Sequence, residues 1–132
     1  MSVAGLQYDK FCSEVVAKKS VYTFTQRDEL LIYPVHDTDV VPFWSSRTRL
    51  LSIAERNPKY TKYAVTVFSL EEFEGWLAQL EEQGMLVGIN WSGERLTGYN
   101  VAVPDLRAAM KARGASGPIT KRSTRLPGSS SR

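Results

Sequence analysis

The sequence holds one cysteine, Cys12, and one histidine, His36, among 132 residues. A single cysteine excludes an internal disulfide and a metal site built from several cysteines. No apolar run approaches the ~20 residues that a membrane-spanning helix needs, and the first residues lack the charged and apolar stretches of a secretory signal. Neither a glycine-rich phosphate loop nor a Gly-x-Ser-x-Gly motif is present. We therefore expect a cytoplasmic protein with no cofactor, no metal and no membrane contact.

Acidic residues are absent from the C-terminal part of the chain. Residues 113–132 carry five Lys and Arg side chains, a net charge of +5, whereas residues 1–112 carry 12 Lys and Arg against 14 Asp and Glu, a net charge of −2. From Gly114 onward, Ile119 and Leu126 are the only larger apolar side chains. Their area is too small to offset the entropy of ordering the segment. We predict a domain at residues 1–112 and a disordered basic tail at residues 113–132.

Hydrophobic residues spaced three and four positions apart predict four helices. Two of them have capping signals, because Ser45 or Ser46 precedes the second helix and Ser69 forms a capping box with Glu72 at the third. Gly84 stands where a helix commonly ends in the left-handed conformation. The predicted helices are residues 6–19, residues 47–56, residues 69–83, and a last helix with Pro104 in its first turn and Leu106, Ala109 and Met110 facing inward.

Short runs of β-branched and aromatic residues predict the strands. Residues 21–25 and 30–33 are predicted to form a hairpin, and a polar break at residues 36–39 precedes a strand at residues 40–43. Pro42 favours an edge position or a strand end, because proline cannot donate a hydrogen bond to a central ladder.

Three further strands are expected in the second half of the chain. Residues 64–68 are predicted as a buried strand, and alternating apolar residues predict strands at residues 85–91 and 99–103, with residues 92–94 and Gly98 as turn residues between them. With 42% hydrophobic residues, the chain can bury one core. The pattern predicts a single α+β domain with a mostly antiparallel sheet of about five to six strands covered by about four helices.

Three motifs of this chain resemble those of a known family: Pro42-Phe43-Trp44-Ser45, Ser69-Leu70-Glu71-Glu72-Phe73 and Leu86-Val87-Gly88-Ile89-Asn90-Trp91. Over about residues 6–112 the chain resembles a family of small bacterial domains of unknown function. More faintly, it resembles the N-terminal domain of enhanced serine sensitivity B-type proteins. These families have no catalytic motif to match. The resemblance therefore implies a fold and a small bacterial accessory protein, without any catalytic residue.

Candidate catalytic and metal-binding residues are few. Cys12 and His36 would form a nucleophile pair if the fold brought them together. However, Cys12 lies on the apolar face of its predicted helix, where a buried structural thiol is expected. His36, Asp37 and Asp39 resemble parts of metal-binding motifs, but the remaining ligands of those motifs are missing. We interpret this segment as a solvated turn, and the glutamates of the third helix as its solvent-exposed face.

The candidate partner-binding residues are aromatic and basic. Trp44 lies at a strand-to-helix junction and Trp91 at a strand end, where a half-exposed aromatic side chain can anchor a partner. The alternative is that both close the core at its ends. Trp76 fits the apolar spacing of its helix and is predicted to be core. The basic candidates are Arg47, Arg49, Arg56, Lys59 and Lys62.

Charge is segregated between two helical segments. Residues 45–63 carry a net charge of +4, whereas residues 69–83 hold five glutamates and no base. The two segments either pair with each other or offer opposite surfaces to partners.

These observations favour a non-enzymatic protein-interaction module, either a toxin-neutralising (immunity) protein or a regulatory partner protein. One alternative is a nucleic-acid-associated protein that uses the basic tail and the basic patch at residues 47–62. A further alternative is a small hydrolase that uses Cys12 and His36. We expect a protein partner, of which the sequence specifies neither the identity nor the oligomeric arrangement.

Overall fold

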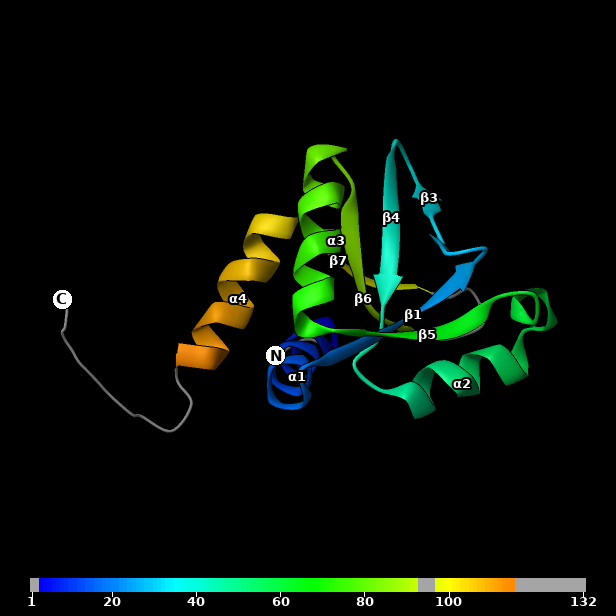
Figure 1. The fold of residues 1–132 in the computed structure, drawn as a ribbon, viewed down its shortest axis with the longest axis horizontal. Helices are drawn as coiled ribbons and strands as arrows, with labels where there is room; N and C mark the ends of the chain where they lie inside the picture. Colours follow the sequence, from blue (N-terminus) through cyan, green and yellow to red (C-terminus); the bar gives the residue numbers. More distant parts are fainter. Residues whose placement is uncertain (1–2, 93–96, 116–132) are drawn as a thin grey trace, which may run out of the picture.

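The computed structural model describes residues 3–92 and 97–115, and Figure 1 shows the arrangement of their helices and strands. None of these helices combines the length and apolarity needed to cross a bilayer. In chain order the elements are α1 (Val3–Lys18), β1 (Ser20–Gln26), β2 (Glu29–Leu30), β3 (Tyr33–Val35), β4 (Thr38–Phe43), α2 (Arg47–Arg56), the 3-10 helix η1 (Pro58–Tyr60), β5 (Ala64–Ser69), α3 (Leu70–Glu82), β6 (Leu86–Ser92), β7 (Thr97–Val101) and α4 (Val103–Ala115).

The described strands form two sheets instead of the one that was predicted. The first has the order β2-β1-β5 and is antiparallel throughout. The second has the order β3-β4-β6-β7, and its β4–β6 pair is parallel. Tyr22 and Trp44 join the two sheets through a pair of backbone hydrogen bonds, each 2.8 Å long. The predicted α+β class with mostly antiparallel pairing is confirmed.

The helices fall into two groups (Figure 1). α4 packs against both α1 and α3, whereas α2 packs along β1 and β5. Two clusters of buried side chains follow this division. The larger one joins α1, α3 and α4 to the strands, and the smaller one surrounds Trp44 and Trp91 and includes Leu50 and Ile53 of α2.

The predicted helix boundaries with local hydrogen-bonding signals are confirmed. Ser46 is the N-cap of α2, and its side chain accepts a hydrogen bond from the backbone N–H of Arg49. At the start of α3, the backbone N–H of Glu72 donates to Ser69 Oγ (3.1 Å), and the backbone N–H of Ser69 donates to Glu72 Oε1 (2.8 Å). Gly84 follows α3 with a φ of +71°.

The first hairpin is confirmed, but its second strand is shorter than predicted. Arg27 and Asp28 form a two-residue turn with φ angles of 56° and 65°, the conformation that matches the twist of antiparallel strands. β2 comprises only two residues. The chain then leaves the first sheet, so that Tyr33 pairs with Val40 in the second sheet.

Two predictions about strand position are corrected. β5 was predicted to be buried, but it is an edge strand, and 56% of the Val67 side chain is exposed. β4, which contains Pro42, is an interior strand, so the edge alternative is wrong. The strand-end alternative is right, because Pro42 is the penultimate residue of β4.

The C-terminal region differs from the prediction at three points. Gly98 was predicted as a turn residue, but it lies inside β7. β7 ends at Val101, and Val103 begins α4 instead of continuing the strand. α4 continues to Ala115, so the predicted domain boundary after residue 112 falls inside this helix, where Arg113 forms an ion pair with Asp9 of α1. The remaining predicted tail, residues 116–132, and the turn residues 93 and 94 lie outside the described residues.

Candidate functional site

Trp44 and Trp91 are buried, so the prediction that they are half-exposed anchors is wrong. Their side chains are 0% and 2% exposed. The indole N–H of Trp44 donates to the backbone carbonyl of Trp91 (2.8 Å), and the indole N–H of Trp91 donates to Asn100 Oδ1 (2.9 Å). Both tryptophans therefore belong to the core, as the alternative interpretation stated.

Trp76, by contrast, is only half-buried, although its helical spacing predicted a core position. Phe73, Leu77 and Leu80 form the buried stripe of α3. Trp76 lies beside this stripe and contacts Phe68 of β5, with their ring centroids 5.8 Å apart.

Cys12 and His36 lie in different parts of the fold. Cys12 is in the core between α1 and the strands, and burial raises the pKa of its thiol to about 11. His36 is exposed in the turn between β3 and β4, with a φ of 56°. A thiol with this pKa is almost entirely protonated at neutral pH, which disfavours it as a nucleophile. Among residues 3–92 and 97–115, no cluster of three or more His, Cys, Asp or Glu side chains is arranged to hold a metal ion.

A buried polar cluster that the sequence did not indicate connects α1 to the second sheet. The Ser45 hydroxyl donates to Glu14 Oε1 (2.5 Å) and accepts from Asn90 Nδ2 (3.1 Å), while the Ser45 backbone N–H donates to Asn90 Oδ1 (2.9 Å). Asn90 has a φ of 44°, beside an irregularity in the β6–β7 register. These bonds satisfy buried polar groups at the junction of α1, β4 and β6, which is a structural role.

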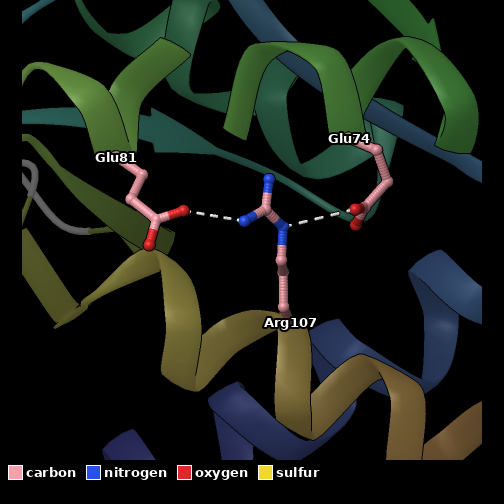
Figure 2. Close-up of polar contacts among 3 residues, drawn as sticks. All are labelled: Glu74, Glu81 and Arg107. Carbon is pink, nitrogen blue, oxygen red and sulfur yellow. Dashed lines mark hydrogen bonds and ion pairs between the residues drawn. The ribbon is translucent and has the colours of Figure 1, made fainter. Parts of the chain in front are cut away.

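The glutamates of α3 do not pair with α2. Arg107 of α4 lies between two of them, with Nε 3.4 Å from Glu74 Oε2 and Nη1 2.8 Å from Glu81 Oε1 (Figure 2). No ion pair among the described residues joins the basic segment at residues 45–63 to α3. The alternative in which these two oppositely charged segments pair with each other is therefore wrong.

The predicted basic residues divide between two hollows. The larger, which we call the α2 hollow, has a volume of about 700 Å³ and contains Arg49 and Arg56. The smaller has a volume of about 260 Å³ and contains Lys59 and Lys62. Arg47 is exposed and lines neither of them.

The α2 hollow is rich in hydrogen-bond donors. Its residues on α2 repeat at three- and four-residue spacing and so form one face of that helix, and Ser92 adds a hydroxyl from the end of β6. None of the described lining residues is an Asp or a Glu. Such a lining suits a carboxylate or a phosphate. The described residues that line it are Ser46, Thr48, Arg49, Ser52, Ile53, Arg56, Asn57 and Ser92.

The two arginines of this hollow differ in how they are held. Arg49 is half-buried, and its Nη1 donates to Gln7 Oε1 of α1 (2.9 Å). Arg56 is exposed and makes no side-chain hydrogen bond or ion pair to the described residues. One guanidinium is therefore positioned in advance, and the other is free to reorient toward a ligand.

The smaller hollow combines lysines with tyrosines. Lys59 Nζ lies 5.2 Å from the centre of the Tyr60 ring, and Lys62 Nζ lies 5.6 Å from the centre of the Tyr63 ring. The hydroxyls of Tyr33 and Tyr60 lie 2.6 Å apart, and burial together with this hydrogen bond raises the pKa of Tyr60. The sequence pattern did not identify the hydroxyl, amide and tyrosine side chains that surround the basic residues of the two hollows. The spacing of Ser46, Arg49, Ile53 and Arg56 was the only signal that could have grouped them.

Comparison with curated proteins finds no match. A family described as "Protein of unknown function (DUF2750)" matches residues 8–110. This agrees with the resemblance to small bacterial domains of unknown function, while the resemblance to enhanced serine sensitivity B-type proteins stays a prediction. Because the match spans most of the chain, including every described strand, this protein belongs to the DUF2750 family.

Proposed function

We propose that this chain is a non-enzymatic binding module that captures an acidic segment of another protein in the α2 hollow. The lining of that hollow carries the proposal: two arginines and five hydroxyl or amide side chains surround about 700 Å³, without an acid among the described lining residues. Carboxylates form short, charge-assisted hydrogen bonds with guanidinium groups. A partner that inserts Asp or Glu side chains would meet the exposed Arg56 guanidinium, which forms no hydrogen bond or ion pair with the described residues.

Arg49 supplies geometric specificity to this site. Its hydrogen bond to Gln7 fixes the guanidinium before a partner arrives, so less side-chain entropy is lost on binding. Its partial burial also weakens screening by salt. Arg56, which is exposed and unpaired among the described residues, completes the site from the following turns of α2.

The remaining cations extend the positive potential beyond the hollow. Arg47, Lys59 and Lys62 add charge along the same segment, which increases the rate of encounter with an acidic surface. We favour a protein partner over nucleic acid because Tyr60, beside the lysines, is only 3% exposed and so offers little surface for base stacking.

The finer form of the proposal is an immunity or regulatory protein of the cytoplasm. Such a protein acts by covering a functional surface of its partner and needs no reacting group of its own. The raised pKa of Cys12 and its distance in the fold from the exposed His36 turn support a mechanism without nucleophilic catalysis.

Fluorescence anisotropy with a labelled glutamate-rich peptide tests this proposal. Arg56→Glu should weaken binding about tenfold, or about 1.4 kcal/mol, because it places a like charge against the ligand. Lys10→Glu makes the same charge change at an exposed position of α1 and should leave the affinity unchanged within about twofold. The Cys12→Ala/His36→Ala double variant should also bind normally.

Single-stranded and duplex oligonucleotides serve as competing probes. If an oligonucleotide binds more tightly than the peptide and Arg56→Glu abolishes that binding, the α2 hollow is a nucleic-acid site and the protein-partner proposal is wrong. If Arg56→Glu and Lys10→Glu weaken the affinity for the peptide equally, only the net charge of the protein matters. This result would also contradict the proposal.

A further inference from the structure

A third concave surface, which we call the α3–β2 groove, has a chemistry opposite to that of the basic α2 hollow. It has a volume of about 390 Å³ and lies between α3 and the β1–β2 hairpin. Its floor includes the buried side chains of Val41 and Leu80, and Met85 is half-buried beside them. Asp28 and Glu29 are exposed on its rim. The groove is therefore apolar inside and acidic at its edge.

Trp76 is the aromatic side chain of this groove, and its indole N–H is unused. The indole N–H groups of Trp44 and Trp91 have acceptors at 2.8 and 2.9 Å. The corresponding group of Trp76 has no acceptor among the described residues, and the ring is only half-buried. A half-buried tryptophan with a free donor combines apolar area with hydrogen-bonding capacity, which is the usual make-up of an interface anchor.

The acidic rim is also without partners. Neither Asp28 nor Glu29 forms an ion pair with the described residues, whereas Glu74 and Glu81 on the same helix as Trp76 are both paired with Arg107. The tight turn with positive φ angles holds Asp28 at the end of the hairpin. Ile32, which is 44% exposed, adds apolar area beside the acids.

We propose that the α3–β2 groove binds a basic amphipathic segment of another protein. An apolar side chain of that segment occupies the floor beside Trp76, and flanking lysines or arginines reach Asp28 and Glu29. A backbone carbonyl of the segment accepts the Trp76 indole N–H. Charge complementarity selects this occupant, because an acidic segment would be repelled by the rim. This site does not depend on the α2 hollow, so the chain would join an acidic partner to a basic one.

A labelled peptide of alternating leucine and lysine is the probe for this groove. In the full chain, Glu29→Lys and Asp28→Lys should each weaken binding at least fivefold, and the pair together at least tenfold. Asp37→Lys is the matched control, because Asp37 is an exposed acid in the other two-residue hairpin turn. This control should retain the wild-type affinity. A peptide of alternating leucine and glutamate should not bind the groove.

Nuclear magnetic resonance of the three indole N–H groups locates the peptide directly. Trp76→Phe identifies the Trp76 signal by its loss. That signal should shift on addition of the leucine–lysine peptide. The signals of the buried Trp44 and Trp91 indoles should shift much less. Because the two rim variants change exposed residues, their result stands even if a Trp76 variant fails to fold.

Two outcomes would overturn the proposal. One is an unchanged Trp76 signal together with equal peptide affinity in the Glu29→Lys and Asp37→Lys variants. The other is a Trp76 signal that shifts with protein concentration and no longer responds to the peptide, which would identify a second copy of this chain as the occupant.

Discussion

At the scale of single residues, the immediate neighbours of each tryptophan decide its role. Trp91 lies against two glycines. A Cβ atom on Gly88 would fall 2.5 Å from Trp91 Cε2, and one on Gly98 would fall 2.8 Å from Trp91 Cδ1. The glycines provide the space in which this indole is buried, while Trp76 has no comparable cover and remains partly exposed. Hydrophobicity alone does not distinguish these side chains.

Gly88→Ala should destabilise the protein by about 1–3 kcal/mol, because the added methyl group forces the Trp91 ring out of a close-packed position. Gly75→Ala is the matched control. Gly75 lies within α3, and no atom of another element comes within 4 Å of the place that an alanine methyl group would take, so this change should stabilise the protein by about 0.5–1 kcal/mol. Urea unfolding measures both. A neutral Gly88→Ala would mean that Trp91 has room to move.

At the scale of elements, α3 is held at its beginning and along its side. Its capping box satisfies backbone donors within the first turn. Arg107 then joins Glu74 and Glu81, which are seven residues apart on the same face of α3 (Figure 2). These ion pairs are about one-third to one-half exposed, so they contribute little to the free energy of unfolding and chiefly orient α4.

Ser69→Ala should reduce the free energy of unfolding by about 1 kcal/mol, because the N–H of Glu72 loses its acceptor at the first turn of α3. Ser13→Ala is the control: this exposed serine lies within α1, where alanine is the better helix former. The control should be neutral or slightly stabilising in thermal and urea unfolding. A destabilisation by Ser13→Ala equal to that of Ser69→Ala would contradict the capping explanation.

At the scale of the whole molecule, closure of the fold depends on α4. α4 packs against α1 and α3, and Leu106 and Met110 contribute to the larger core cluster. The ion pair between Arg113 and Asp9 adds a contact near the end of this helix. α4 itself extends to Ala115, three residues beyond the predicted boundary, so we propose that the domain includes the whole of this helix.

A chain that ends at Ala115 should keep the wild-type melting temperature. Residues 116–132 contain only Ile119 and Leu126 as larger apolar side chains, too few to contribute a core. A chain that ends at Ala112 should melt a few degrees lower, because loss of a surface ion pair costs up to about 1 kcal/mol. Differential scanning calorimetry distinguishes the two. A fall of many degrees for the longer truncation product would show that the remaining C-terminal residues pack on the domain.

Measuring binding affinity at several salt concentrations distinguishes binding by the basic tail from binding by the α2 hollow. Nucleic-acid binding by the tail alone would weaken steeply with salt and disappear in the chain ending at Ala115. Peptide binding by the half-buried Arg49 would persist in that chain.

The elements that could be predicted are those whose signals lie within a few residues of one another. Ser46, the Ser69–Glu72 capping box and Gly84 specify helix ends through local hydrogen bonds and φ angles. The hairpin turn at Arg27 and Asp28 was likewise local. Among the candidate site residues, Arg49 and Arg56 were grouped in one basic segment, and both line the α2 hollow. The spacing did not reveal that they share a hollow with Ser92, which is far away in the chain.

Capping, periodicity and composition act locally, so the amino-acid pattern alone predicts the helices, the main strands, the α+β class and the segregation of charge. The packing of distant segments sets four other features: the division into two sheets, the exposed edge at β5, the burial of Trp44 and Trp91, and the partial exposure of Trp76. These features depend on which distant segments meet. An apolar side chain is buried only where another element covers it. The residues that are its neighbours in the sequence do not show which element that is, and they do not show which distant residues line the opposite side of a hollow.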